Sequence, residues 1–122
     1  MKEEADDDLE ERLLNFAARV VRFSESLPGT AAGRYLAGQV LRSGTAPMAH
    51  HGEAQAAESE NDFIHKMKVA HKELRETIRW IRLAVRLPLV DDGKRIEPRI
   101  RQNDGLIRIF WANIKTAKQS EQ

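Results

Sequence analysis

The sequence predicts an all-α protein, an antiparallel up-down four-helix bundle, and three observations support this prediction. Apolar residues recur at helical spacing in four stretches, short segments separate these stretches, two of them with proline and glycine, and no stretch alternates with the two-residue period of a strand. The chain has 122 residues, which is the size of one domain. We therefore expect a single bundle over residues 1–122, with a flexible acidic start at 1–6 and a frayed end at 119–122.

The first helix is expected to begin near Asp6–Asp8, because acidic side chains suit the positive end of a helix dipole. Its apolar residues recur at alternating steps of four and three, which is typical of a coiled-coil seam. These residues are Leu9, Leu13, Phe16, Val20, Phe23 and Leu27. Pro28 and Gly29 then end the helix, since proline has no amide hydrogen to donate and glycine tolerates a turn.

The second helix is expected over about residues 31–57, with Thr30 as its N-cap. It is rich in alanine, glycine and serine, whose small side chains let neighbouring backbones approach closely. The bulk between them is expected from Tyr35, Leu36, Val40 and Leu41. Pro47 cannot donate to the carbonyl of Ser43, so the sequence predicts a kink or a break between about Gly44 and Met48.

The third helix follows a capping-box pattern, in which Ser59 precedes Asp62 by three residues, and it runs to about Leu87 before Pro88. It carries an apolar stripe, expected to be buried, made of Phe63, Met67, Ala70, Leu74, Ile78, Ile81 and Val85. A fourth helix is expected from near Glu97, with Ile100, Ile107, Phe110 and Ile114 facing inward.

The third helix also carries a row of cations at steps of four and three, roughly opposite the apolar stripe. This basic row consists of Lys68, Lys72, Arg75, Arg79, Arg82 and Arg86. The charge of the chain is uneven, because residues 1–11 hold seven acids and one base. The other residues hold 19 bases and 12 acids, a net charge of about +7. Such a basic body suggests a polyanion partner, or a neighbouring subunit that receives the acidic tip.

The basic row has two interpretations. It can follow a phosphate backbone, and few aromatic residues are expected to be exposed, which argues against base stacking as the main mode. Alternatively, Glu73 and Glu76 pair locally with Lys72, Arg75 or Arg79, which would leave a solvated, salt-bridged face.

Little in the sequence points to catalysis or to a cofactor. Cysteine is absent, which excludes disulfides and thiolate metal sites. His50, His51 and Glu53 invite a metal hypothesis, but adjacent helical positions point about 100° apart, so the two histidines cannot face one ion. We predict no catalytic residue, no metal and no cofactor. We also predict a cytoplasmic protein that does not enter a membrane, because no apolar run approaches the length of a membrane span.

One run of residues resembles a bacterial four-helix-bundle family named after intervening sequences of ribosomal RNA. The resemblance covers most of residues 10–118 and is densest at 39–80. It rests on Gln39-Val40-Leu41-Arg42-Ser43-Gly44-Thr45, Glu53-Ala54-Gln55-Ala56-Ala57-Glu58-Ser59, Asp62-Phe63-Ile64-His65-Lys66, Lys72-Glu73, Arg75-Glu76-Thr77 and Trp80. The chain departs from the family pattern at Ala46-Pro47 and Ala49-His50.

The resemblance implies a compact bundle that associates in rings of five, and it brings no catalytic residues. A related branch resembles the accessory protein of diversity-generating retroelements, which implies RNA or DNA and a reverse transcriptase as partners. We therefore expect a non-enzymatic, self-associating helical bundle, a pentamer, that presents its basic row to RNA or DNA. The alternative is a protein-protein adaptor without nucleic-acid binding, in which the acidic N-terminus pairs with the basic row of a neighbour.

Overall fold

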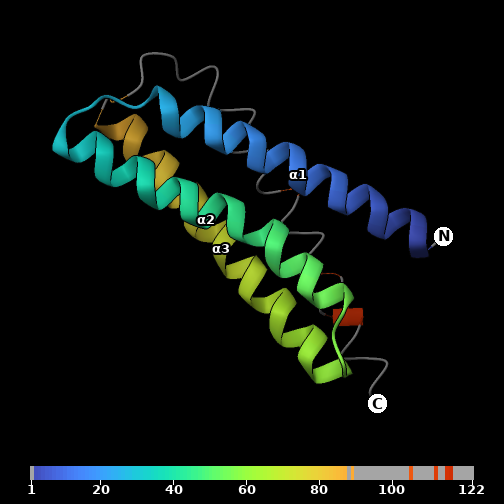
Figure 1. Ribbon diagram of the computed structural model, residues 1–122. Coiled ribbons are helices and arrows are strands. Elements are labelled where there is room, and N and C mark those ends of the chain that lie inside the picture. Colours follow the sequence, from blue (N-terminus) through green and yellow to red (C-terminus); the bar gives the residue numbers. More distant parts are fainter. Residues whose placement is uncertain (1, 88, 90–104, 106–111, 113–114, 117–122) are drawn as a thin grey trace.

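The structure is a computed structural model that describes residues 2–87, 89, 105, 112, 115 and 116, with side chains described from Asp8 onward. It contains three helices: α1 over Lys2–Ser26, α2 over Ala31–Gln55 and α3 over Glu60–Arg86. Figure 1 shows α2 between the other two helices. Within the described residues, α2 packs on both neighbours, whereas the backbones of α1 and α3 do not approach each other closely.

The predicted count of four helices is wrong, because the described residues form three. The segment predicted as the fourth helix lies largely outside the described residues. In that segment the structure describes Gly105, Ala112, Lys115 and Thr116, each in helical conformation, and Thr116 Oγ1 donates to the carbonyl of Ala112 at 3.0 Å. Within the part that the structure describes, no helix is long and apolar enough to cross a bilayer.

Helix α1 buries the apolar seam that its sequence predicts. Leu13, Phe16 and Val20 are each 1% exposed, and Leu9 and Phe23 are also buried in the core. The helix begins at Lys2, before the predicted start near Asp6–Asp8, because the acidic side chains there are compatible with the first turns of the helix as well as with a cap. It ends at Ser26, just before Pro28 and Gly29, as predicted.

Helix α2 begins at its predicted cap and continues through its proline. Thr30 Oγ1 accepts a hydrogen bond from the amide of Gly33 at 3.1 Å. The predicted break between Gly44 and Met48 is wrong, since α2 is one continuous helix with Pro47 buried inside it. A kink at this position stays a prediction. Packing against two neighbours supports the helix where proline removes a backbone hydrogen bond.

The bulky residues of α2 divide into a buried and an exposed pair. Leu36 and Val40 are buried at 3% and 0% exposure, as predicted. Tyr35 and Leu41 are 60% and 40% exposed, so the prediction that they fill the space between helices is wrong for them. Tyr35 and Leu41 are bulky and largely apolar like the buried pair, but their side chains are exposed.

Gly44 shows why small residues matter in α2. A methyl group added at Gly44 would overlap the side chain of Val20 on α1. The absence of a side chain therefore sets how closely α1 and α2 approach each other.

Helix α3 begins at Glu60 and is capped by Ser59, whose Oγ accepts from the amide of Asp62 at 3.1 Å, as the capping-box pattern predicts. Its buried face is rotated slightly from the predicted one. Ile64 and Ala84 are buried in place of Phe63, which is half-buried, and Val85, which is 39% exposed. The central positions of the predicted stripe, from Met67 to Ile81, are buried.

Candidate nucleic-acid interface

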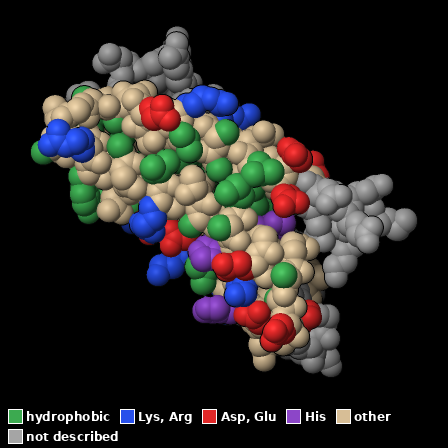
Figure 2. Space-filling view, in the orientation of Figure 1, with side chains coloured by type: hydrophobic (Ala, Val, Ile, Leu, Met, Phe, Trp, Pro, Cys, Tyr) green, Lys and Arg blue, Asp and Glu red, His purple; other side chains and the backbone are tan. Residues whose placement is uncertain are grey.

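All six residues of the basic row are exposed on α3. The row covers 18 helical steps from Lys68 to Arg86, which is about 27 Å along the helix axis. A short segment of nucleic acid has a similar length. In the view of Figure 2, hydrophobic side chains gather over α1 and α2, and histidine and acidic side chains lie toward the C-terminal end of α2.

The acids that were expected to neutralise the basic row are bound by another residue. Arg42 on α2 donates from Nη1 to Glu73 Oε2 at 3.0 Å, and from Nη2 to Glu76 Oε2. In the described part of the chain, no carboxylate forms an ion pair with the five members of the row from Lys72 to Arg86. The interpretation in which Glu73 and Glu76 neutralise the row is therefore wrong for these residues.

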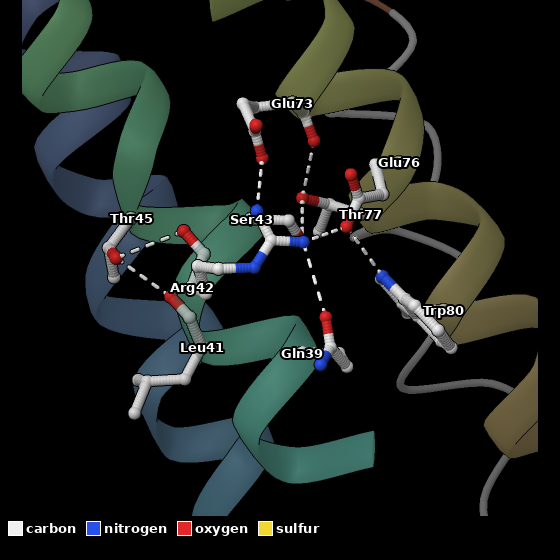
Figure 3. A network of polar contacts seen from close by, with 9 residues as sticks. All are labelled: Gln39, Leu41, Arg42, Ser43, Thr45, Glu73, Glu76, Thr77 and Trp80. Carbon is white, nitrogen blue, oxygen red and sulfur yellow. Dashed lines mark hydrogen bonds and ion pairs between the residues drawn. The ribbon is translucent and has the colours of Figure 1, made fainter. Parts of the chain in front are cut away.

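Arg42 is held by several contacts at once (Figure 3). Its Nη2 also donates to Gln39 Oε1 at 3.2 Å, one turn earlier on α2. Burial lowers the pKa of Arg42, but the carboxylates of Glu76 and Glu73 outweigh burial and raise the pKa above its ordinary value. The Arg42 side chain is 49% exposed, so water screens these attractions. Arg42 is therefore a fixed cation that links α2 to α3.

A buried hydroxyl pair lies beside Arg42. Ser43 and Thr77 are both 0% exposed, and their hydroxyl oxygens are 2.9 Å apart. Thr77 Oγ1 also donates to the carbonyl of Glu73 at 2.8 Å. A hydroxyl has a single proton, so Ser43 supplies the proton between the two hydroxyls when Thr77 donates to this carbonyl. The pair satisfies two polar groups that would otherwise be costly to bury between α2 and α3.

An aromatic pair continues this network toward the end of α3. Trp80 Nε1 donates to Glu76 Oε2 at 2.9 Å, and the indole packs against the hydrophobic core. The ring of Tyr35 on α2 meets the ring of Trp80 edge to face, with centroids 5.9 Å apart and planes at 83°. Arg42, Glu76, Trp80 and Tyr35 therefore form one connected series across the two helices.

Sequence analysis did not identify this series as a unit, although much of it lies in the run that carried the family resemblance. Arg42, Glu76 and Trp80 are all in that run. The only available signal for the ion pair was that Arg42 and Glu76 carry opposite charges on two helices that were expected to be antiparallel. No signal in the sequence distinguished the exposed Tyr35 from the buried Leu36 beside it.

The histidines do not form a metal centre in the described part of the chain, where no three metal-ligating side chains gather. His50 Nδ1 is 3.5 Å from Glu53 Oε2, on the shared face that their spacing predicts. His51 is 2% exposed, and its Nε2 is 3.2 Å from Gln55 Nε2.

His71 lies beside the basic row and is half-buried. Burial, followed by the charge of Arg75, holds the pKa of His71 below its ordinary value. His71 is therefore neutral at neutral pH, and the charge of the surface there comes from lysine and arginine.

Comparison with known proteins identifies the family. A crystal structure of a protein of unknown function from the S23 ribosomal protein family of Bacteroides thetaiotaomicron is similar, with 30% sequence identity and a TM-score of 0.83. The match covers 90% of this chain and 97% of that chain. No curated protein matches the chain. The family described as 23S rRNA-intervening sequence protein matches residues 7–108. The chain therefore belongs to the 23S rRNA-intervening sequence protein family.

Proposed function

We propose that the basic row binds the phosphate backbone of RNA or DNA, and that the protein acts as a non-enzymatic nucleic-acid accessory protein. One observation carries this proposal. The members of the row are exposed along one helix, while Arg42 on α2 binds Glu73 and Glu76. In the described part of the chain, the five members from Lys72 to Arg86 form no ion pair with a carboxylate, and such cations keep their attraction for an external polyanion.

The dimensions of the row support this function. A length of about 27 Å corresponds to about eight nucleotide steps at 3.4 Å each. Contacts of this kind release counterions and are insensitive to sequence. We therefore expect binding that depends steeply on salt concentration and little on base sequence.

The test is fluorescence anisotropy with labelled RNA and DNA over a salt series. Replacing Arg75, Arg79 and Arg82 with alanine should weaken binding and reduce the slope of log K against log salt by about one for each lost contact. The matched control replaces Arg19, Arg22 and Arg34 with alanine. These residues are exposed on α1 and α2, and their replacement removes the same number of positive charges. The control should have a much smaller effect.

The proposal fails if the protein does not bind at low salt, or if the two triple variants behave alike. Deleting residues 1–8 should strengthen binding, because it removes acids that repel the same polyanion. If the deletion instead dissociates an assembly without affecting nucleic acid, the adaptor function is favoured. Self-association in rings of five and a reverse-transcriptase partner stay predictions, and light scattering tests the first of them.

A further inference from the structure

An exposed aromatic pair lies next to the basic row, where the sequence predicted almost no exposed aromatic surface. Tyr35 is 60% exposed, although Leu36 beside it in sequence is buried. Trp80 is half-buried and stands between Arg79 and Arg82 along α3. Aromatic surface beside cations is the combination that single-stranded nucleic acids use, since bases stack on rings while phosphates contact cations.

Both rings are held in place before any ligand arrives, and Figure 3 shows the contacts of Trp80. The core fixes one side of the Trp80 indole, and the hydrogen bond from Nε1 to Glu76 fixes its orientation. Arg42 in turn holds Glu76. The edge-to-face contact with Trp80 then restrains Tyr35. A ring that is already ordered loses little entropy when a base stacks on it.

The surface of α2 next to Tyr35 is open. Gly38 lies one turn after Tyr35 and one turn before Arg42, and a Cβ added at Gly38 would meet no atom within 4 Å. Between the aromatic ring and the guanidinium group, α2 therefore has open space at Gly38. Both groups present planar surfaces on which a nucleic-acid base can stack.

Apolar side chains extend this surface along α3. Leu83 and Leu87 are 40% and 46% exposed, one and two turns after Trp80. In a duplex the bases are stacked inside and their faces are not available to side chains. An aromatic and apolar surface beside a row of cations therefore fits a strand whose bases are unpaired better than it fits a duplex.

We propose that Tyr35, Trp80 and Arg42 form a base-stacking site that makes the interface prefer single-stranded over duplex nucleic acid. The proposal rests on the function proposed above, because the basic row must hold the backbone for a base to reach Tyr35. It names the class of ligand that the row alone does not determine.

The experiment compares three labelled probes at low salt: a polyuridine strand long enough to cover the row, an abasic strand of the same length, and a duplex. The wild-type protein should bind polyuridine about tenfold more tightly than the abasic strand, within the range of one stacked base. Tyr35→Ala should bring this ratio close to one and leave duplex affinity unchanged. Tyr35→Phe keeps the ring and should keep the ratio.

Gly38→Leu provides a second variant, since a Cβ at this position would meet no atom within 4 Å and the new side chain lies between Tyr35 and Arg42 along α2. It should lower the polyuridine-to-abasic ratio while the protein is at least as stable as the wild type, because leucine has the higher helix propensity. The triple alanine variant of Arg75, Arg79 and Arg82 should weaken binding of all three probes and leave the ratio unchanged.

The outcomes separate this inference from the function on which it rests. Equal affinity of the wild type for polyuridine and for the abasic strand overturns the stacking site, while nucleic-acid binding stands. Failure to bind any probe overturns both. If Tyr35→Ala changes the mass of the protein in solution and not the ratio, this face is a contact between copies of the chain and the stacking site is rejected.

Discussion

The two interfaces of α2 are built from different chemistry. Toward α1, the contact is apolar and close, with Val20 against Gly44 and with Phe16 and Leu13 buried in the core. Toward α3, buried hydroxyls and a half-exposed ion-pair network are added to the apolar contact. The first interface stabilises by excluding water and filling space. The second also requires particular residues to face each other.

This difference teaches how α2 and α3 are kept in register. An apolar surface tolerates a small sliding motion, because one methyl group replaces another. A slide between α2 and α3 would separate Ser43 from Thr77 and leave a buried hydroxyl without its partner, which is costly. We infer that the polar contacts select one alignment of the two helices, whereas the apolar seam of α1 supplies stability.

The largest effect is expected at the contact between α1 and α2. Gly44→Ala should destabilise the protein by about 2–3 kcal/mol, because the added methyl group overlaps Val20 and the helices must separate. Urea denaturation followed by circular dichroism measures this change. Adding Val20→Ala should recover part of the loss, since it makes room for the methyl group.

Gly38→Ala is the matched control for this substitution, made on the same helix at an open position. It should stabilise the protein by about 0.5–1 kcal/mol, because alanine has the higher helix propensity. If both glycine variants change stability in the same direction, close packing of α1 on α2 is not what Gly44 provides.

An intermediate effect is expected at the buried hydroxyls. Thr77→Val leaves Ser43 without its partner and should cost about 1–2 kcal/mol. Ser43→Ala should cost less than about 1 kcal/mol, because Thr77 can still donate to the carbonyl of Glu73. The same denaturation measurement compares them. Equal costs would contradict the expectation that Ser43 depends on Thr77 more than Thr77 depends on Ser43.

The smallest effect is expected at Arg42. Arg42→Ala should cost less than about 1 kcal/mol, because the side chain is half exposed and screened by water and salt. Stability measured at low and at high salt should show that the difference from wild type shrinks as salt rises. Arg42→Lys keeps the charge but cannot bind two carboxylates with the geometry of a guanidinium group. The stability of this variant should therefore lie between that of the wild type and that of Arg42→Ala. A loss that is independent of salt would point to packing in place of charge.

The sequence predicted one interface much better than the other, for a physical reason. The seam of α1 repeats within one helix, so Leu13, Phe16 and Val20 announce it by spacing alone. The network of α2 and α3 joins Arg42 to Glu73 and Glu76 over 31 and 34 residues, and local spacing carries no information about such pairs. The sequence therefore predicted local pairing of these acids, and the structure shows a contact between helices.

The basic row could be predicted as a surface, because its spacing places every member on the side away from the buried stripe. The aromatic site could not. Tyr35 is adjacent to Leu36 in sequence, and only the direction in which α2 presents each residue separates an exposed ring from a buried side chain. The helix count was also wrong, since the described residues form three helices and the segment predicted as the fourth lies largely outside them.

The position of α2 between two partners has a consequence for how the chain is made. Glycines at 33, 38, 44 and 52, together with Pro47, make α2 a poor helix on its own. During synthesis, α1 and α2 leave the ribosome before α3 exists to receive the Arg42 side chain. We expect α2 to acquire stable structure late. Hydrogen exchange along α2 should be fast in nascent chains that have emerged from the ribosome only as far as residue 58, and slow in longer chains from which residues 73–77 have also emerged.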